Sequence, residues 1–545
     1  MAAEFTHIVI GAGAAGAVLA ARLSEDPDIR VLLVEAGGPA RGPLVSVPLM
    51  TVLLMRSTRH AWLYQTEPSP GLEGRRIVWP RGRALGGSTV INGMVYVRGL
   101  PSDYDGWAQR GLPGWSWEAV RPYFLRSERF LGPGGEAAAH GANGPLPVSR
   151  PERPVSPLAD AFIEAGIAAG YPACTDFNGA EPEGFGFYHF TNRRGRRVST
   201  ARAFLDPVRD RPNLSILTGA EAVRLRLANG RATGVELRRG RRSETVHCAG
   251  EIILSAGAIG SPALLMRSGI GPPEHLAALG IPVAVEAPEV GANLHDHVLV
   301  RLKQAATGGT DLWRLSRPHR AAAAFLRAWA FGTGPMAVFP LEAGAYLRSP
   351  GADLPDLQSH FLPALSSTSL RMRTVGARDP LERPGFMANI GVMRPQSRGR
   401  LRLRSADPAD PPLIAPNYLA ERADVERLID GLEIMREVFA QAPFDRWRGA
   451  ELDPGPEIAG RRALEGWVRR TADTVHHAVG TCRMGADPAS VVDGALRVRG
   501  VAGLRVADAS VFPAIPSTNT AAPAIMVGEK AADLVLGREA PEAAA

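Results

Sequence analysis

A glycine-rich turn between an apolar strand and a helix is the feature that most constrains the fold of this chain. The sequence Gly-Ala-Gly-Ala-Ala-Gly at residues 11–16 directly follows the apolar run His7–Ile10. It opens the alanine- and leucine-rich segment Ala15–Ser24, and a second apolar run, Ile29–Glu35, ends in an acid. This order of segments predicts a β-α-β unit.

The three glycines of this turn predict a dinucleotide site. Gly11 permits the tight turn, Gly13 lets the backbone approach a pyrophosphate, and Gly16 lets the helix pack close to the sheet. The helix N-terminus offers free N–H groups to the phosphates. Glu35 can accept hydrogen bonds from ribose hydroxyls, which an ordinary glycine turn would not explain. The motif alone does not separate FAD from NAD(P).

Signals of a nucleotide-binding domain recur later in the chain. Strands are expected at Ala232–Leu237 and Glu251–Ser255, followed by a helix at Pro262–Ser268. Near the end, Leu504–Ala507 predicts a strand and Ile525–Leu536 a helix. The segments between these blocks are rich in Pro, Arg and Gly, and we expect them to form a second lobe over the cofactor.

A second glycine-rich loop lies at Arg81–Gly93 and reads Arg-Gly-Arg-Ala-Leu-Gly-Gly-Ser-Thr-Val-Ile-Asn-Gly. Two adjacent glycines followed by hydroxyl side chains make a backbone surface that a flat ring or a phosphate can approach closely. The apolar Val90 and Ile91 within it indicate a packed loop rather than a mobile one.

Several long motifs of this chain resemble those of the glucose–methanol–choline (GMC) oxidoreductases. The first signature of that family is similar to Gly82–Gly99, and the second to Gly257–Gly271. The resemblance continues through Asn293–His297 and reaches the C-terminal part at Val506–Ser510 and 525–534. It covers essentially the whole chain, with the motifs in the family's order.

The resemblance implies the fold class and the domain organisation. It implies an α/β fold (α+β overall) with a Rossmann-like FAD-binding domain and an interleaved substrate-binding domain built on a mostly antiparallel sheet with covering helices. The expected FAD-binding domain is discontinuous and comprises residues 1–155, 215–295 and 460–545. The expected substrate-binding domain comprises residues 156–214 and 296–459.

The resemblance also implies FAD bound in an extended form. Glu35 would meet the ribose, Val223 the adenine, and Asp508 and Ala509 the pyrophosphate or the ribityl chain. The other expected cofactor-binding residues are Gly11, Gly13 and Gly16 at the phosphates and Arg83, Gly87, Ser88, Asn92 and Gly93 toward the flavin. Some relatives attach the flavin through a histidine where this chain has Ile91, which has no nucleophile, so non-covalent FAD is expected.

A histidine near the end of the chain is the expected catalytic base. Oxidising an alcohol removes the hydroxyl proton and transfers a hydride to flavin N5, and a base with a pKa near neutral accelerates that step. The run Thr474–Gly485 is similar to the family's active-site segment, and its alignment puts the base at His477. Side chains of neighbouring residues in an extended segment point to opposite faces. We therefore expect His476 to be a packed residue.

The loop before the last helix departs from the family pattern. Relatives normally provide a second polar residue there to hold the substrate oxygen. Asn519 keeps the first of two asparagine positions, but Ala521 occupies the second. The lost hydrogen bond typically costs a few kcal/mol of transition-state stabilisation unless it is replaced. There are three explanations. Asn519 or the backbone supplies the missing hydrogen bond, His477 acts alone, or the chemistry is not ordinary alcohol oxidation. We favour the first two.

The sequence therefore predicts FAD-dependent oxidation of a primary alcohol to an aldehyde, with His477 and Asn519 as catalytic residues and no metal. The expected partners are a small alcohol and an electron acceptor, either O₂ or another compound. The alternative is a GMC-fold flavoprotein with non-oxidative or light-driven chemistry, a lyase or a decarboxylase, which Ala521 suggests. A non-catalytic flavin-binding protein is a third reading, against which His477 and the second signature argue.

Charge and cysteine content bound the partners and the compartment. The net charge of +7 would suit nucleic acid, but the arginines are scattered, and their one tight cluster, Arg193–Arg197, has no aromatic platform beside it. Nucleic acid is therefore not expected as a partner. The three cysteines offer neither a disulfide framework nor a metal site, and the N-terminus reads directly into a strand. We expect a cytoplasmic location.

The two longest apolar runs are Val45–Met55 and Ala321–Leu341. The first is too short to span a bilayer, and the second contains Arg327 and Pro335. No membrane span is expected, and peripheral contact with a membrane remains open.

The substrate is the least constrained part of the prediction. The chain offers no evident acidic and aromatic cage for a quaternary ammonium group, which disfavours choline. A primary alcohol that is aromatic or otherwise apolar is expected. Several large aromatic side chains are candidates for an apolar pocket, although most are expected in the core: Trp62, Trp313, Trp329, Phe331, Phe339 and Phe361.

Overall fold

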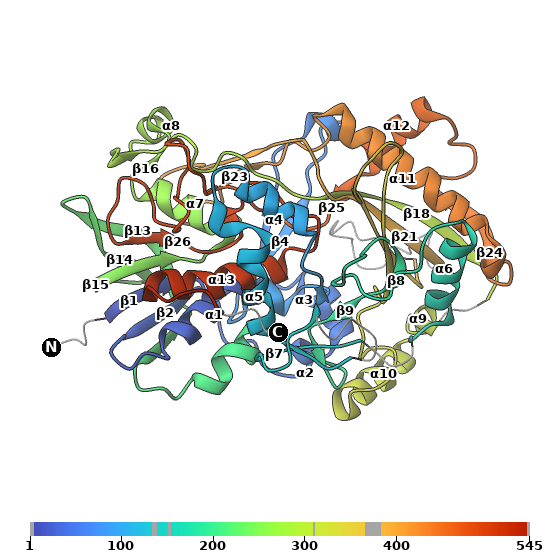
Figure 1. The fold of residues 1–545 in the computed structure, drawn as a ribbon, viewed down its shortest axis with the longest axis horizontal. Coiled ribbons are helices and arrows are strands. Elements are labelled where there is room, and N and C mark those ends of the chain that lie inside the picture. Colours follow the sequence, from blue (N-terminus) through green and yellow to red (C-terminus); the bar gives the residue numbers. More distant parts are fainter. Residues whose placement is uncertain (1–4, 133–138, 151–153, 309–310, 366–382, 542–545) are drawn as a thin grey trace.

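Two seven-stranded sheets organise the chain and lie side by side in the computed structural model (Figure 1). The structure describes residues 5–132, 139–150, 154–308, 311–365 and 383–541. The first sheet, which we call the nucleotide sheet, has the order β12-β2-β1-β15-β14-β13, with β26 also paired to β15. Its strands are β1 (Phe5–Ile10), β2 (Val31–Glu35), β12 (Leu214–Thr218), β13 (Glu221–Ala228), β14 (Arg231–Arg239), β15 (Arg242–Leu254) and β26 (Leu504–Val506).

The central strands of the nucleotide sheet are parallel. β1 pairs in parallel with β2 and β15, β12 pairs with β2, and β26 pairs with the end of β15. Every residue of β2 is buried, as expected where helices cover both faces of a parallel sheet. The predicted β-α-β unit is confirmed, because α1 (Ala14–Leu23) joins β1 to β2.

The other predicted elements of this sheet are also confirmed, with shifted bounds. The strand expected at Glu251–Ser255 is the buried end of β15, whose first residues are exposed and form an antiparallel ribbon with β14. The polar composition of that ribbon hid it from the hydrophobic pattern. The helix expected at Pro262–Ser268 is α7 (Gly257–Arg267), and α13 (Ala521–Leu536) packs against α1 and α5 (Trp117–Ser127).

The second sheet has the order β24-β18-β21-β20-β19-β8, with β25 beside β18, and every pair in it is antiparallel. It confirms the expected antiparallel sheet. Its strands are β8 (Gly184–Phe187), β18 (Val298–Ala306), β19 (Ala343–Leu347), β20 (Leu357–Leu362), β21 (Gly385–Val392), β24 (Arg448–Asp453) and β25 (Asp473–Thr474).

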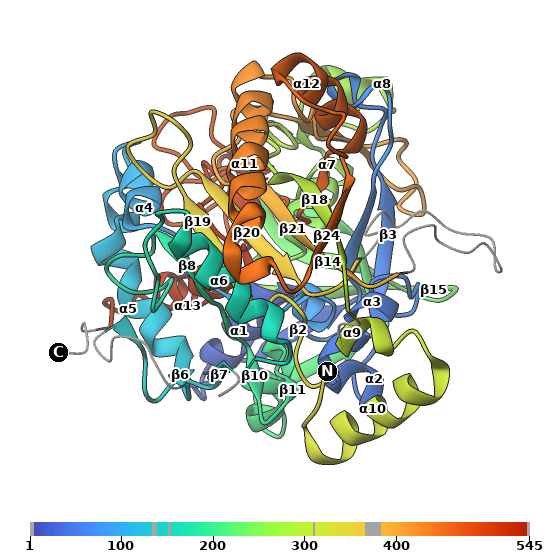
Figure 2. The same ribbon diagram turned by 90° about the vertical axis from the view of Figure 1, so that its right-hand side faces the viewer.

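Helices cover one face of the second sheet (Figure 2). The long helix α11 (Arg422–Ala440) packs on β18 and β21, and it contacts α6 (Pro157–Ala168) and α12 (Arg461–Thr471). An aromatic cluster that includes Phe361, Phe386 and Phe439 fills the space between strands and helices.

Smaller elements complete the fold. The two-stranded pairs are β3 (Ala61–Gln65) with β4 (Val78–Gly82), β5 (Val95–Tyr96) with β9 (His189–Phe190), β6 (Glu128–Phe130) with β7 (Leu146–Val148), β10 (Asn192–Arg193) with β11 (Arg196–Arg197), β16 (Ile270–Gly271) with β17 (Val285–Glu286), and β22 (Arg400–Arg402) with β23 (Leu413–Ala415). The remaining helices are α2 (Pro43–Ser46), α3 (Thr51–Leu54), α4 (Pro101–Ala108), α8 (Pro273–Ala278), α9 (Asp311–Arg314) and α10 (Pro318–Phe331). Within the described ranges, no helix combines the length and the apolar character needed to cross a bilayer.

Candidate active site

Three consecutive residues ahead of β18, His295-Asp296-His297, organise the predicted catalytic segment. The buried carboxylate of Asp296 accepts a hydrogen bond from the backbone N–H of His477 at 2.6 Å and from the hydroxyl of Thr474 at 2.5 Å. It also accepts one from the hydroxyl of Tyr418. These bonds fix the backbone at His477, three residues after the end of β25.

The first member of the triplet holds the loop that carries Asn519. The backbone N–H of Ile515 donates to His295 Nδ1 at 3.2 Å. The other ring nitrogen lies 3.0 Å from the side-chain oxygen of Asn293. Burial lowers the pKa of His295 well below its usual value, so the ring is neutral and bridges two chain segments.

The third member sets the tautomer of the predicted base. His297 Nε2 lies 2.9 Å from the carbonyl oxygen of Met393, which can only accept, so Nε2 carries the proton. Burial lowers the pKa of His297 to about 4, and the ring is therefore neutral with Nδ1 as an acceptor. His477 Nδ1, at 2.8 Å from that Nδ1, must donate. His477 Nε2 is left without a proton, which is the state that a general base requires.

Asn519 lies beside the free nitrogen of the base. Its Nδ2 is 3.2 Å from His477 Nε2, and its Oδ1 is 3.2 Å from Gln358 Nε2. Because the amide oxygen of Asn519 accepts from Gln358, its NH₂ group faces His477. The structure thus brings together the two predicted catalytic residues.

A further histidine completes this cluster. Burial lowers the pKa of His360 to about 4, although a hydrogen bond to Asn519 opposes the shift. Its Nε2 is buried and has no partner among the described residues. Gln358 and His360 are two residues apart on β20, so both side chains lie on the same face of that strand.

The local electrostatics keep His477 unprotonated. Burial lowers its pKa well below the usual value, and the neighbouring rings of His297, His360 and His476 together with the charge of Arg81 lower it further. The imidazole is therefore unprotonated at neutral pH and able to accept a proton, and the lowered pKa makes it a weaker base than a free histidine.

The backbone at His476 differs from the expectation. The residue has φ 66°, in the left-handed region, so the segment is not extended and the alternation argument was wrong. The carbonyl oxygen of His476 accepts from Arg81 at 2.7 Å, and its N–H donates to Thr474 at 2.7 Å. Its Nδ1 is buried without a partner among the described residues, and no hydrogen bond joins its ring to that of His477.

The N-terminal glycines fit a dinucleotide. A Cβ at Gly11 would lie 2.4 Å from the carbonyl oxygen of Ser255, and one at Gly16 would lie 1.9 Å from that of Gly11. Both positions must be glycine for the fold itself. A Cβ at Gly13 would meet nothing nearer than 4.0 Å, so the space above it is open, as the approach of a pyrophosphate requires.

Two side chains near this turn, Glu35 and Arg83, can form further hydrogen bonds with a ligand. Glu35 accepts from the backbone N–H groups of Ala12 at 3.0 Å and Gly37 at 2.8 Å. Burial raises its pKa to about 7, against these bonds and the charge of Arg83. Ribose hydroxyls would supply further donors. The guanidinium of Arg83 lies 4.4 Å from the ring centroid of Trp62, and its buried Nε has no partner among the described residues.

The second glycine-rich loop packs directly on the first turn. A Cβ at Gly87, the first residue of the 3₁₀ turn η3 (Gly87–Val90), would lie 2.6 Å from the Cα of Gly13. A small cavity runs from this loop to the start of α13, and its wall includes Thr89, Asn92 and Ala521. The two glycine-rich turns therefore lie against each other, and the open space at Gly13 with the acceptors of Glu35 beside it fits the phosphates and a ribose of a dinucleotide such as FAD.

The remaining predicted residues make contacts within the protein. Ser88 Oγ accepts from the backbone of Gly82 at 3.1 Å, and Asn92 Oδ1 accepts from Arg197 at 2.8 Å. A Cβ at Gly93 would lie 3.1 Å from the ring of Phe339.

Asp508 binds the N-terminus of α7. Its carboxylate accepts from the N–H of Gly257 at 2.8 Å and from Ser261 Oγ at 2.6 Å. Ala509 begins the 3₁₀ turn η9 (Ala509–Val511). Val223 lies at an irregularity in the pairing of β13 with β14, at the edge of the nucleotide sheet.

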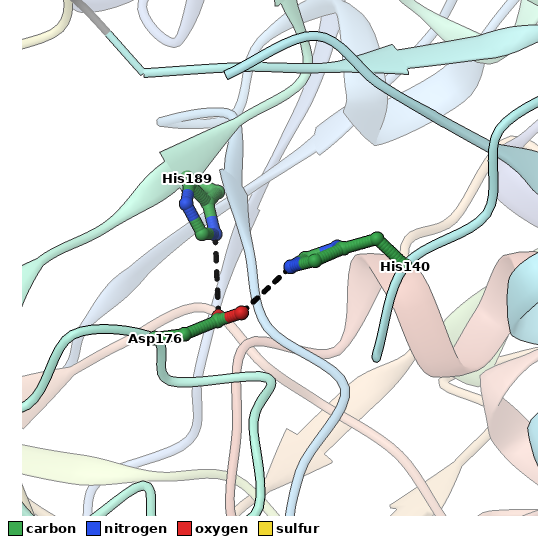
Figure 3. Close-up of side chains that lie close together, drawn as sticks. All are labelled: His140, Asp176 and His189. Carbon is green, nitrogen blue, oxygen red and sulfur yellow. Dashed lines mark hydrogen bonds and ion pairs between the residues drawn. The ribbon is translucent and has the colours of Figure 1, made fainter. Parts of the chain in front are cut away.

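Among the described residues, one group of side chains has the composition of a metal site: His140, Asp176 and His189 (Figure 3). His140 Nε2 lies 2.7 Å from Asp176, and its Nδ1 lies 2.6 Å from Glu128. Burial opposes the charge on His140, but the bonds to Asp176 and Glu128 outweigh it and raise the pKa. Both ring nitrogens are thus engaged, and we interpret the group as a buried imidazolium between two carboxylates.

Sequence reasoning missed His297 as a partner of the base, and it missed Gln358 and His360. His297 lies in a motif that was noted only for its family resemblance. The signal for the other two was the sequence Gln-Ser-His inside the apolar run Leu357–Leu362, where polar residues two apart share one face of a buried strand.

Comparison with known proteins agrees with this geometry. The GMC oxidoreductase family matches residues 5–299 and again residues 395–528. The chain is 42% identical to an oxygen-dependent choline dehydrogenase of Burkholderia lata, over 98% of this chain and 94% of the relative. It is 42% identical to one of Chromohalobacter salexigens, over 99% and 96%. A crystal structure of pyridoxine 4-oxidase from Mesorbium loti is similar with a TM-score of 0.88 and 34% identity, covering 98% of this chain and all of the other.

Fold, site and relatives define a class of flavin-dependent oxidoreductases that act on CH–OH donors. The chain belongs to the GMC oxidoreductase family, for which FAD is the expected cofactor.

Proposed function

We propose that this enzyme oxidises an uncharged primary alcohol to the aldehyde, with His477 as the general base. The observation that carries the proposal is the chain of hydrogen bonds from Met393 through His297 to His477, which leaves His477 Nε2 unprotonated and pointing at Asn519.

The chain's own residues account for the handling of the proton. His477 Nε2 receives the hydroxyl proton of the substrate. Asn519 Nδ2, 3.2 Å from that nitrogen, donates to the substrate oxygen as negative charge develops on it. This donor replaces the hydrogen bond that is missing at Ala521, and the unpartnered Nε2 of His360 is a second candidate for contact with the substrate oxygen. Bound FAD supplies the acceptor of the hydride.

The charges around the base support an uncharged substrate. Arg81 acts on His477 as a nearby positive charge. The buried carboxylate of Asp296 is engaged by three donors. A quaternary ammonium substrate would meet a cation and no available carboxylate among the described residues near the base. We therefore propose an aromatic or aliphatic alcohol, although the curated relatives are choline dehydrogenases.

The experiment is anaerobic mixing of the purified yellow enzyme with benzyl alcohol, hexanol and choline while the flavin absorbance is followed. We expect rapid bleaching by benzyl alcohol or hexanol, little by choline, and none in His477→Ala. Chemical reduction with dithionite serves as the control that the flavin of each variant can be reduced. If choline bleaches the flavin fastest, the substrate proposal is wrong. If no alcohol does so, the non-oxidative alternative suggested by Ala521 gains support.

Three further features belong to the same proposal. FAD is held without a covalent bond, because Ile91 offers no nucleophile, and acid precipitation should leave all flavin in the supernatant. Admission of air after bleaching separates an oxidase from a dehydrogenase. A reducing, cytoplasmic compartment fits the three cysteines, which are all buried and free, and cell fractionation tests it.

A further inference from the structure

The two longest apolar runs of the chain form one small lobe at its surface. Val47 of the first run packs with Ala324, Ala328 and Met336 of the second in a separate hydrophobic cluster. The backbone N–H of Leu49 donates to the carbonyl oxygen of Met336 at 3.3 Å. Figure 2 shows α2 and α3 beside α9 and α10 at one corner of the molecule. We call residues 41–60 and 312–341 the arginine lobe.

The outer face of the arginine lobe is apolar. Six of the eleven exposed large apolar side chains of the described residues belong to the lobe: Leu44, Val52, Leu53, Leu326, Trp329 and Phe331. Trp329 is 45% and Phe331 77% exposed, so neither is the core residue that the sequence led us to expect. Helix α10 buries Ala324 and Ala328 against the lobe and turns Leu326 and Trp329 outward. Such clustering marks an interaction surface.

The charge of this lobe has a single sign. Residues 41–60 and 312–341 contain seven arginines and no aspartate or glutamate: Arg41, Arg56, Arg59, Arg314, Arg317, Arg320 and Arg327. Two acids adjoin the lobe, Asp311 at the start of α9 and Asp206, which pairs with Arg41 at 3.4 Å, so the lobe keeps a formal charge of +5 when these two acids are counted against its seven arginines.

The arginine cluster Arg193–Arg197 borders the same lobe. Arg196 donates to the carbonyl oxygens of Trp329 and Ala330 at the end of α10. Arg193 and Arg194 of this hairpin are exposed. The cluster therefore adds positive charge at the rim of the apolar face, which gives it a place in the fold that sequence reasoning did not find.

We propose that the arginine lobe docks the enzyme on the surface of an anionic phospholipid membrane. Tryptophan, phenylalanine and leucine side chains enter the headgroup region while arginines around them meet lipid phosphates, as in interfacial amphipathic helices. Each arginine near an anionic surface contributes about 1 kcal/mol of attraction. A second copy of this chain is a poorer occupant, because a two-fold contact through this face would bring like charges together.

The test is co-sedimentation of the full-length FAD-loaded enzyme with vesicles of 30% phosphatidylglycerol and 70% phosphatidylcholine, compared with pure phosphatidylcholine. We expect at least tenfold tighter binding to the anionic vesicles and a loss of that preference in 0.5 M NaCl. The double variant Arg56→Ser/Arg320→Ser should bind about 30-fold more weakly, from two charges at about 1 kcal/mol each.

Matched variants separate the lobe from general surface effects. Trp329→Ser/Phe331→Ser should lose at least tenfold in vesicle binding with unchanged flavin content and melting temperature. Leu354→Ser, at an exposed apolar residue outside the lobe, should bind as the wild type does. Equal binding to both kinds of vesicle, or no binding to either, would overturn the proposal. So would a dimer in sedimentation analysis that Trp329→Ser/Phe331→Ser abolishes without any lipid binding, since a second copy would then be the occupant.

Discussion

Replacement of His297 is the sharpest test of how the base is positioned. In the structure His297 Nδ1 accepts from His477 Nδ1 at 2.8 Å, and no other acceptor for that N–H is present among the described residues. His297→Leu removes the acceptor and leaves a buried N–H unsatisfied, at a cost of about 1–3 kcal/mol. If that cost falls on the reactive orientation of His477, kcat drops by about 5- to 150-fold.

A second variant keeps the bond. The side-chain oxygen of asparagine occupies nearly the position of a histidine Nδ1, so His297→Asn preserves the acceptor for His477 while it loses the bond to Met393. We expect this variant to keep kcat within about threefold of the wild type. The comparison of the two variants therefore measures the bond to the base and not the loss of an imidazole.

The assay is steady-state turnover at saturating alcohol, with flavin content and melting temperature measured on each variant. A loss confined to kcat in His297→Leu, at full flavin loading, supports the role. Equal losses in both variants would mean that the bond to His477 is not what matters. An unchanged kcat in His297→Leu would refute the positioning argument altogether.

Further predictions concern the charge cluster, the phosphate turn and the amide beside the base. His140→Gln should cost about 3 kcal/mol of unfolding free energy near pH 5, where the raised pKa of His140 keeps it charged. The contribution of His140 to the free energy of unfolding is full below about pH 6.5 and is lost as the pH rises through its raised pKa. The contribution of Asp176 to the free energy of unfolding is lost as the pH falls toward its pKa of about 2. In thermal denaturation, the stability difference between the wild type and His140→Gln should accordingly be smaller at pH 9 than at pH 5. A difference that does not change with pH would refute the imidazolium. Gly16→Ala should fail to fold or lose FAD. Gly13→Ala should keep the melting temperature of the apoprotein and weaken only FAD binding in a flavin titration. An equal loss of melting temperature in both variants would contradict the open space above Gly13. Asn519→Ala should lower kcat by about 10²-fold with His477 intact, and a change in KM alone would show that the amide only binds substrate.

The nucleotide sheet was predictable because its evidence is local. The turn at residues 11–16, the acid at Glu35 and the apolar strands on either side follow from near neighbours in the chain. The first half of β15 is exposed and no buried face imposes a pattern on it, so only its inner end could be found. The left-handed backbone at His476 likewise depends on contacts with Arg81 and Thr474, which are set by the tertiary fold.

The position of His477, the proposed base, could be predicted, but the side chains that contact it could not. His477 was identified from its own segment, whereas His297 and Gln358 come from parts of the chain that are distant in sequence, 180 and 119 residues earlier. Which residues of β20 face the site depends on the register of the second sheet, and no short-range signal reports that register. Asn519 could be predicted from its own loop, but the orientation of its amide toward His477 depends on the hydrogen bond from Gln358.

The parallel pairing of β26 with the end of β15 has a consequence for biosynthesis. The edge of β15 at Ile252–Leu254 is covered only by Leu504–Val506 of β26. These residues are synthesised about 250 residues later. At a translation rate of about 5–20 residues per second the delay is roughly 12–50 s. During that time the nascent protein exposes an apolar, unpaired strand edge beside its cofactor turn. Chaperone dependence of this enzyme should therefore fall on the last stage of its synthesis, and flavin capture should follow release of the chain from the ribosome.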